Sequence, residues 1–369
     1  MAMTAPTPSP SARPDVERLR GYSAPLEGRR GLLRLDFNEN TIGPSPAVVE
    51  ALRAFPADQI AVYPEYDGLR EAVIGNLQDS PAGLAHALLP QQVGLFNGVD
   101  AAIHAVIHAY GASGDTLLTT SPTFGYYAPC AGMQGMVVEA VPHELPGFRF
   151  PLEAMRAALQ RGPKILMLCN PNNPTGTRLS AEHVLLLASS APDTLVVVDE
   201  LYEAFTGDSV LPHVDFAEHA NLLVLRSLAK TAGLAGLRMG FAIGSAEVVD
   251  RVCRVSGPYD VNSFAVTAAF AALSDQAYTD HYVAEVLRAR NYLVTELTRS
   301  GAVFHVDGGN YLLVWPRSSA QQVEQQLRDA GILVRSMAGK PQIDGSLRVS
   351  IGTQEQMQRF WECYRKLER

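Results

Sequence analysis

The chain has 369 residues, of which 47% are hydrophobic and 18% charged, so it is long enough for two packed domains. Its formal net charge of −8 argues against nucleic acid or an anionic membrane as the main partner. The four cysteines lie far apart and form neither a CxxC pair nor a zinc-ligand spacing with histidine. We therefore expect no disulfide framework, no metal site and a cytoplasmic location.

Residues 1–14 are rich in Ala, Pro, Ser and Thr, and we expect them to form a disordered or partner-wrapping arm. This segment lacks the apolar centre of a signal peptide, and no other stretch has the length of a membrane span. Residues 15–60 are predicted to continue the arm and to complete part of a smaller domain.

Short apolar runs alternate with helix-like segments from about residue 95 to 245. The predicted strands are residues 116–119, 136–141, 164–169, 194–198, 222–226 and 239–243. Runs of Val, Leu and Ile without polar alternation are typical of strands that are covered on both faces. With helices over 99–110 and 180–190, the pattern predicts an α/β domain over residues 61–255, with a mostly parallel sheet between helices.

The remaining residues, 256–369, follow a different pattern. Apolar residues near helical spacing predict a long amphipathic helix over 281–300 that links two domains. Short strands over 311–315, 332–335 and 347–351, with helices near 319–330 and 353–367, predict a smaller α+β domain.

Polar residues follow two of the predicted strands. Asp199 and Tyr202 follow the strand at 194–198, and Asn173 lies in the string Asn-Pro-Asn-Asn-Pro-Thr-Gly after the strand at 164–169. Ligands of open α/β sheets gather at the carboxyl ends of strands. An Asp at a strand end is often structural, and Asn, Pro and Gly are common turn formers, so each piece alone also has a structural explanation.

Two further pieces could bind a planar, phosphorylated ligand. The string Phe-Asn-Gly-Val-Asp at 96–100 opens a helix, where free backbone N–H groups bind phosphate, although any helix start offers as much. Phe124 follows a strand and could lie flat on a heteroaromatic ring, although an aromatic there is more often part of the core.

Lys230 lies in the most informative stretch of the chain. It follows an apolar run, with the hydroxyl of Ser227 three residues before it and the guanidinium of Arg238 eight residues after it. A lysine so placed can bond covalently to an aldehyde cofactor while Ser227 and Arg238 hold a phosphate. A lone lysine is more often a solvated surface residue, but the residues at the other strand ends favour a chemical role.

Together these motifs resemble the fold-type I, pyridoxal-phosphate (PLP)-dependent aminotransferases of class I and II, and within them most closely the histidinol-phosphate aminotransferases. The resemblance runs from Asn38-Glu39-Asn40 to Arg348 and so covers nearly the whole chain. It is carried by the strings at residues 35–40, 43–44, 62–64, 172–176 and 234–238.

The resemblance implies the roles around the cofactor ring. Lys230 would hold PLP covalently and then move a proton between the donor Cα and the cofactor. Asp199 would keep the pyridine nitrogen protonated. Asn173 and Tyr202 would hydrogen-bond the ring 3′ oxygen, and Phe124 would stack on the ring. Lys230, Asp199 and Tyr202 are the predicted catalytic residues.

The resemblance also implies a phosphate site and a dimer. The cofactor phosphate would accept from the backbone of Val99 and Asp100, the Ser227 hydroxyl and the Arg238 guanidinium. Tyr63 would reach the same phosphate from a second subunit, which predicts a homodimer with shared active sites.

The substrate side is predicted at Arg348, which would bind a substrate carboxylate or, in histidinol phosphate, the phosphate. Arg335 is a second phosphate candidate, and Asn40 and Tyr22 would line the substrate. Either arginine could instead be an exposed charge on a strand.

Three positions depart from the family pattern. Ala229 replaces a second hydroxyl beside the lysine, Lys340 stands where Tyr is common, and Phe124 replaces a Tyr at the stacking position. These changes affect affinity rather than the core chemistry.

The expected reaction is transamination between histidinol phosphate and 2-oxoglutarate. An aromatic or other amino-acid aminotransferase and a decarboxylase like the threonine-phosphate decarboxylases are the alternatives. A non-catalytic sensor is disfavoured, because Lys230, Asp199 and Arg238 are all present.

Overall fold

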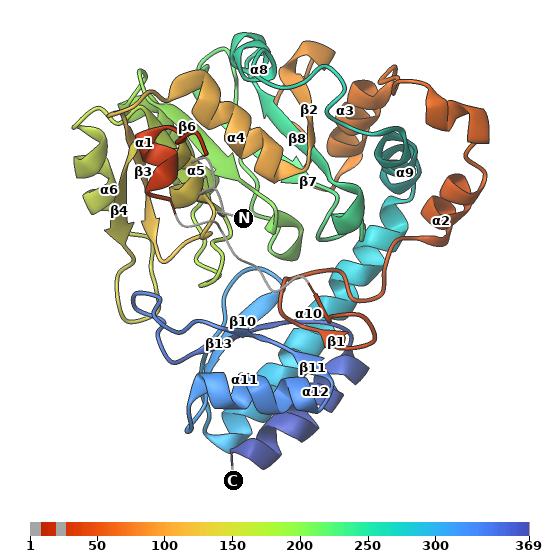
Figure 1. Ribbon diagram of the computed structural model, residues 1–369, viewed down its shortest axis with the longest axis vertical. Helices are drawn as coiled ribbons and strands as arrows, with labels where there is room; N and C mark the ends of the chain where they lie inside the picture. The colour runs from red at the N-terminus through yellow and green to blue at the C-terminus, as the bar shows by residue number, and fades with distance from the viewer. Residues whose placement is uncertain (1–8, 20–26, 369) are drawn as a thin grey trace, which may run out of the picture.

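A seven-stranded sheet forms the centre of the larger part of the computed structural model, which describes residues 9–19 and 27–368 (Figure 1). The strands lie in the order β2-β8-β7-β6-β5-β3-β4. Their bounds are β2 Val93–Asn97, β3 Thr116–Ser121, β4 Val137–Pro142, β5 Ile165–Cys169, β6 Leu195–Asp199, β7 Leu222–Ser227 and β8 Met239–Gly244.

The pairs formed by β4, β3, β5, β6 and β7 are parallel, whereas β8 runs antiparallel to both β7 and β2. The predicted mostly parallel sheet is therefore confirmed. The edge strand β2 was not predicted, because its residues were interpreted as the approach to a helix.

Helices cover both faces of this sheet, and the alternation of strand residues decides which face each side chain meets. Val197 of β6 packs in one core with Ile103 and Val106 of α4 (Val99–Tyr110). Its neighbour Val196 packs in another core with Leu187 of α7 (Ala181–Ser190). All of these side chains are buried, which explains why the strands lack polar alternation. Further helices of this part include α3 Leu69–Asp79, α5 Tyr127–Met133, α6 Leu152–Leu159 and α8 Ala246–Cys253.

The smaller part is built on a four-stranded antiparallel sheet in the order β12-β13-β10-β9. A long helix, α10 (Gln276–Ser300), runs from the larger part to this sheet (Figure 1). The remaining elements are β9 Val303–His305, β10 Tyr311–Trp315, α11 Ala320–Asp329, β12 Arg335–Ser336, β13 Leu347–Ser350 and α12 Gln354–Leu367.

The single strand predicted over 332–335 is wrong. The structure has β11 (Ile332–Leu333), which pairs with β1 (Leu33–Arg34), and then β12 in the four-stranded sheet. Val334 separates the two strands and is buried, so the chain changes sheets without exposing its apolar side chains.

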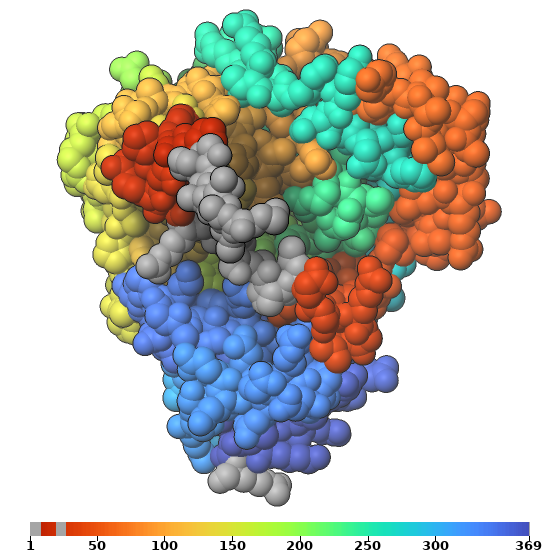
Figure 2. All heavy atoms as spheres, viewed as in Figure 1, coloured from red at the N-terminus to blue at the C-terminus, as the bar shows by residue number. Residues whose placement is uncertain are grey.

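Residues 15–60 are distributed over both parts. The short helix α1 (Pro14–Glu17) contacts α5, β1 joins β11, and α2 (Pro46–Arg53) packs on α9 (Ser263–Ser274). Because α9 shares a core with β2 and β8, we place it with the larger part, up to the start of α10. The segment at 27–45 lies at the junction of the two parts (Figure 2).

Candidate active site

Lys230 lies in the loop between β7 and the short helix η4 (Ala235–Leu237), at the carboxyl edge of the large sheet. Its Nζ donates to the carbonyl oxygen of Phe37 at 2.9 Å and lies 5.9 Å from the centre of the Tyr202 ring. Burial, and then the positive charge of Arg348, lower the pKa of Lys230 from 10.5 to about 8. About a tenth of this amine is therefore neutral at pH 7, far more than for an ordinary lysine, and able to act as a nucleophile or base.

Asp199 ends β6 and is 2% exposed. Its Oδ2 accepts from the Tyr127 hydroxyl at 2.6 Å, and its Oδ1 accepts from the Leu201 N–H at 3.3 Å. Burial raises the pKa of Asp199 to about 6, while these two hydrogen bonds lower it. A positively charged group beside this carboxylate would offset the cost of its burial.

Tyr127 was not predicted as a site residue. The aromatic string at 121–127 signals rings near the strand end, but spacing does not tell which hydroxyl turns inward. Phe124, which was predicted, is half-buried and meets the Tyr127 ring edge-on, with centroids 5.4 Å apart. Phe124 therefore lies beside the group that holds Asp199.

The Tyr202 hydroxyl accepts from two amides, Asn38 Nδ2 at 3.1 Å and Asn173 Nδ2 at 3.2 Å. Arg348 Nη1 in turn donates to Asn173 Oδ1 at 2.7 Å, and Arg348 Nη2 donates to the carbonyl oxygen of Asp36. These bonds join the ends of two large-sheet strands to the small sheet. Asn38, which has a left-handed φ of 56°, was in a recognised motif but was not predicted as a site residue.

Gly98, Gly240 and Arg238 pack closely together at the N-terminus of α4, and we call this group the cradle. Gly98 has a φ of 79°, and a Cβ on it would lie 2.5 Å from Arg238 Nη2. A Cβ on Gly240 would lie 2.6 Å from the carbonyl carbon of Gly98. Only residues without a side chain allow the guanidinium to reach the start of the helix, where the N–H groups of Val99 and Asp100 have no intrahelical acceptor.

The polar contacts of the cradle are made by three predicted residues. Arg238 Nη2 lies 2.8 Å from Asp100 Oδ2, and both side chains are partly exposed. The Ser227 hydroxyl donates to the carbonyl oxygen of Met239 at 3.0 Å and accepts from the N–H of Ala229. A guanidinium, a hydroxyl and a helix start together form an anion site.

The two predicted substrate arginines are register partners across β12 and β13. Arg335 and Arg348 therefore project from the same face of the small sheet, with Cβ atoms roughly 4.5–5.5 Å apart. The Arg335 guanidinium lies 5.8 Å from the centre of the Phe37 ring, and that of Arg29 lies 4.2 Å from the same ring.

The other predicted positions are less closely joined to this group. The Asn40 amide donates to the Thr231 carbonyl at 2.8 Å and accepts from two backbone N–H groups, so it supports the loop that carries Lys230. Tyr63 is 70% exposed and stacks on Tyr259, with centroids 4.1 Å apart. Lys340 is exposed in a turn, and the predicted Tyr22 lies outside the described residues.

In the part of the chain that the structure describes, no three His, Cys, Asp or Glu side chains are grouped so that they could hold a metal ion. Within the same residues, no helix combines the length and apolar character needed to cross a bilayer.

Comparisons with known proteins agree with this geometry. The family "Aminotransferase class I and II" matches residues 30–363. A histidinol-phosphate aminotransferase of Symbiobacterium thermophilum is 34% identical over 96% of this chain and 97% of its own length. A second, histidinol-phosphate aminotransferase 1 of Bradyrhizobium diazoefficiens, is 33% identical over 91% of this chain and 93% of its own.

Solved structures show the same fold. A histidinol-phosphate aminotransferase from Sinorhizobium meliloti, in complex with pyridoxal-5′-phosphate, has a TM-score of 0.84 and 24% identity, covering 96% of this chain and 97% of that one. A double mutant of Thermus thermophilus aspartate aminotransferase has a TM-score of 0.82 and 24% identity, covering 97% of this chain and all of that one (100%).

Proposed function

This chain belongs to the class I and II aminotransferase family, and we propose that it transfers the amino group of histidinol phosphate to 2-oxoglutarate with PLP as cofactor. The products would be imidazole acetol phosphate and glutamate, as a step of histidine biosynthesis. Relatives that match over most of their length carry the histidinol-phosphate aminotransferase name. The structural observation that carries the choice of substrate is the pair of arginines that face each other on the small sheet.

The residues present fit PLP. The cradle formed by Gly98, Gly240 and Arg238 offers an anion site for the cofactor phosphate, and Lys230 offers a partly neutral amine. Among the described residues, buried Asp199 forms no direct ion pair, and a protonated pyridine nitrogen would supply one. When bound, PLP supplies an electron sink that stabilises negative charge at the substrate Cα.

Lys230 would do two things in succession. It would hold the cofactor through a covalent bond, for which its lowered pKa supplies the neutral amine. Once the substrate amine has displaced it, its Nζ would take the proton from the donor Cα and deliver it to the cofactor carbon that had been bonded to the lysine. The 2.9 Å hydrogen bond to Phe37 orients this amine before the cofactor binds.

The groups around the ring would fix its charge. Asp199 would hold the proton on the pyridine nitrogen, and the Tyr127 hydroxyl, 2.6 Å away, would keep the carboxylate ionised and oriented. Asn173 and Tyr202 would hydrogen-bond the ring oxygen, because they already form one bonded pair in the site. Phe124 would cover the ring face and exclude water.

Arg348 and Arg335 would bind the phosphate of histidinol phosphate. Two guanidiniums on neighbouring strands repel each other, and a dianion between them relieves that repulsion. The carboxylate of an ordinary amino acid carries one negative charge and needs one arginine. The pair therefore favours a phosphorylated donor over the amino-acid alternatives, and Arg348 would bind a carboxylate of 2-oxoglutarate in the second half of the reaction.

A homodimer is part of the proposal. The exposed apolar side chains of the larger part include Ile60, Val62, Tyr63, Tyr259 and Phe264, and Tyr63 stacks on Tyr259. Single exposed apolar residues are ordinary, but a group of this kind marks an interaction surface. We propose that two copies meet here and that Tyr63 of the partner subunit reaches the phosphate cradle. We also propose a cytoplasmic location.

A donor screen tests the reaction. Purified protein with PLP and 2-oxoglutarate is offered histidinol phosphate, Phe, Tyr, His or Leu, and both glutamate and CO2 are measured. We expect glutamate to form with the highest kcat/KM from histidinol phosphate. A higher value with another donor would replace the proposed substrate, and CO2 without glutamate would establish a decarboxylase.

The Lys230→Ala variant tests the assignment of the lysine. It should lose turnover and the absorbance of covalently held cofactor, whereas Lys164→Ala, at an exposed position before β5, should keep both. Turnover that persists in Lys230→Ala would remove this residue from the mechanism.

A further inference from the structure

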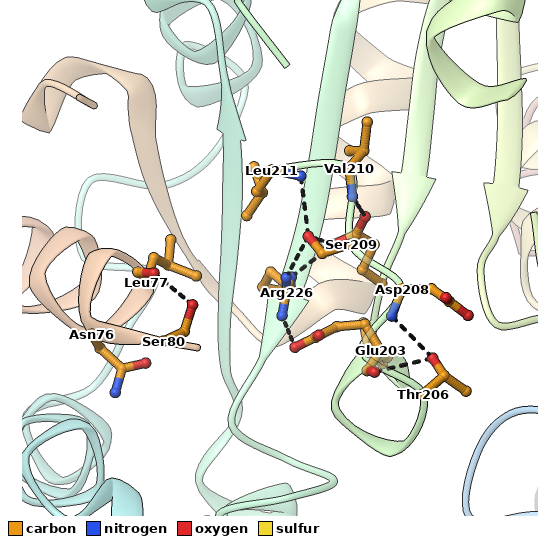
Figure 3. Close-up of polar contacts among 12 residues, drawn as sticks. Asn76, Leu77, Ser80, Glu203, Thr206, Asp208, Ser209, Val210, Leu211 and Arg226 are labelled. Carbon is orange, nitrogen blue, oxygen red and sulfur yellow. Dashed lines mark hydrogen bonds and ion pairs between the residues drawn. The ribbon is translucent and has the colours of Figure 1, made fainter. Parts of the chain in front are cut away.

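A cavity lies apart from the candidate active site. Its walls are formed by α3, by α10 and by residues 203–212. Its volume is about 380 Å³, within the roughly 300–1,000 Å³ typical of small-molecule sites. Figure 3 shows Asn76, Leu77 and Ser80 on one side, facing Glu203 and Arg226 on the other. None of its lining residues belongs to the apolar group proposed as the dimer contact.

The cavity and the candidate cofactor site lie on opposite sides of the ends of β6 and β7. Glu200 directly follows Asp199, the last residue of β6, and Arg226 precedes Ser227 in β7, so neighbouring residues carry the polar groups of two different sites. Successive side chains of a strand point to opposite faces. Arg226 Nε donates to Glu200 Oε2 at 3.0 Å, which places this ion pair behind the residues proposed to hold PLP.

The charge of the cavity is negative. Glu200 is buried and its charge is balanced by Arg226. Arg226 also donates to Glu203 Oε1 and to the Ser209 hydroxyl (Figure 3). Glu203 Oε2 has no hydrogen bond among the described residues, and Asp280 adds an exposed carboxylate from α10. The lining thus carries two carboxylates, those of Glu203 and Asp280, and one guanidinium, which also pairs with the buried Glu200 behind the lining.

The rest of the lining is mainly apolar. Leu77 of α3, Leu211 of the third wall, and Val283 and Leu287 of α10 contribute most of the hydrocarbon surface. A ligand here would therefore gain from an apolar body and from one positive charge that reaches Glu203.

We infer that this cavity binds a small organic cation, a protonated amine attached to an apolar body, with Glu203 as its charge partner. A smaller cavity of about 90 Å³ shares Glu203 and Arg226 with it and extends to Ser227 and Thr231, on either side of Lys230. Occupancy of the larger cavity therefore acts on the segment that carries the lysine, and the site is suited to an effector.

Calorimetric titration of the holoenzyme with N,N-dimethylphenethylamine tests this inference. The probe is a cation at pH 7.5, and as a tertiary amine it does not condense with an aldehyde. We expect saturable binding of one probe per chain and binding roughly tenfold weaker, or weaker still, for the uncharged 2-phenylethanol. Binding should also shift the absorbance spectrum of the bound cofactor.

Variants decide where the probe binds. Glu203→Gln should raise the Kd of the amine roughly tenfold and leave the Kd of the alcohol unchanged. Ala284→Trp, at an exposed position in the α10 wall, should block both probes, whereas Ala277→Trp, exposed on the same helix outside the lining, should not.

Absence of binding, equal affinity for amine and alcohol, or binding that neither Glu203→Gln nor Ala284→Trp alters would each overturn the inference. The readout needs no turnover, so its failure is distinct from a failure of the proposed transaminase reaction.

Discussion

Arg335 and Arg348 stand directly opposite each other across β12 and β13, and Arg348 alone of the two reaches across to the large part through Asn173. The same sheet face thus carries one arginine tied into the cofactor site and one that lies over the Phe37 ring. From this asymmetry we predict two uses of positive charge: Arg348 for every acidic substrate, and Arg335 for a phosphate only.

Replacing each arginine with Gln should separate these uses. Arg335→Gln should raise the KM for histidinol phosphate by roughly tenfold or more, with little change for glutamate, because one charge-assisted contact worth about 1.5–3 kcal/mol is lost. Arg348→Gln should raise KM for both. Steady-state kinetics in each direction measures this, with Arg299→Gln at the exposed end of α10 as control. An equal effect of Arg335→Gln on both substrates would indicate a structural role.

Tyr127→Phe should weaken PLP binding and lower kcat. The variant removes the 2.6 Å hydrogen bond to Asp199, so the pKa of the buried carboxyl rises further and its ionised form becomes less available to the pyridine nitrogen. A loss of about 1.5–3 kcal/mol corresponds to roughly 10- to 100-fold in cofactor Kd. Tyr364→Phe is the matched control, because its buried hydroxyl has no hydrogen-bond partner among the described residues. Similar Kd values for the two variants would contradict the role of Tyr127.

Gly98→Ala should reduce cofactor affinity much more than Gly114→Ala. Both glycines have positive φ, 79° and 91°, so both substitutions strain the backbone. Only at Gly98 would the new methyl group meet Arg238, at 2.5 Å; at Gly114 nothing lies within 4 Å. The thermal unfolding temperature of the apoprotein measures the backbone strain that both variants share. The Kd from a PLP titration measures the effect on the phosphate cradle. If both variants bind PLP equally, Arg238 does not depend on that close approach.

The rate at which the apoprotein captures PLP covalently should rise with pH around a midpoint near 8, because the neutral Lys230 amine is the reacting form. Arg348→Gln should move this midpoint upward, since removing a nearby positive charge makes the ammonium form easier to hold. An unmoved midpoint would show that Arg348 does not act on the lysine.

The same lowered pKa has a consequence for stability. Between about pH 8 and the ordinary value of 10.5, the unfolded chain binds more protons at Lys230 than the folded chain does. The apoprotein should therefore gain stability from this group as pH rises through that window. Comparing the denaturant midpoint of the apoprotein with that of Lys230→Met across this range isolates the contribution.

The sequence predicts well those strands in which every residue is buried. Val196 and Val197 belong to a strand buried on both faces, and its position was predicted to within one residue at each end. At 332–335 the same apolar signal misleads, because Leu333 and Arg335 pair with two different strands, one near the start of the chain and one that follows shortly after. Periodicity carries no information about partners.

The site shows the same limit. Lys230, Asp199 and Arg238 were predicted because strand ends and motif strings mark them. The part played by Tyr127 depends on which of several adjacent rings turns inward, and that depends on packing against α4 and β6. Asn38 depends on a left-handed turn and a contact with Ser350, 312 residues away.

Residues 36 and 37 accept from Arg348 and Lys230 through backbone carbonyls. In the proposed mechanism, Lys230 would leave its acceptor when it holds PLP, and Arg348 would leave its acceptor when it binds an acidic substrate. Binding of the cofactor or of the substrate would therefore break one hydrogen bond to the main chain of residues 36 and 37, and binding of both would break both hydrogen bonds. Because the acceptors are main-chain carbonyl oxygens, substitutions at positions 36 and 37 would change the packing of this segment without removing the acceptors. The proposed occupancy of the site is thus linked to the main chain of residues 36 and 37 rather than to their side chains.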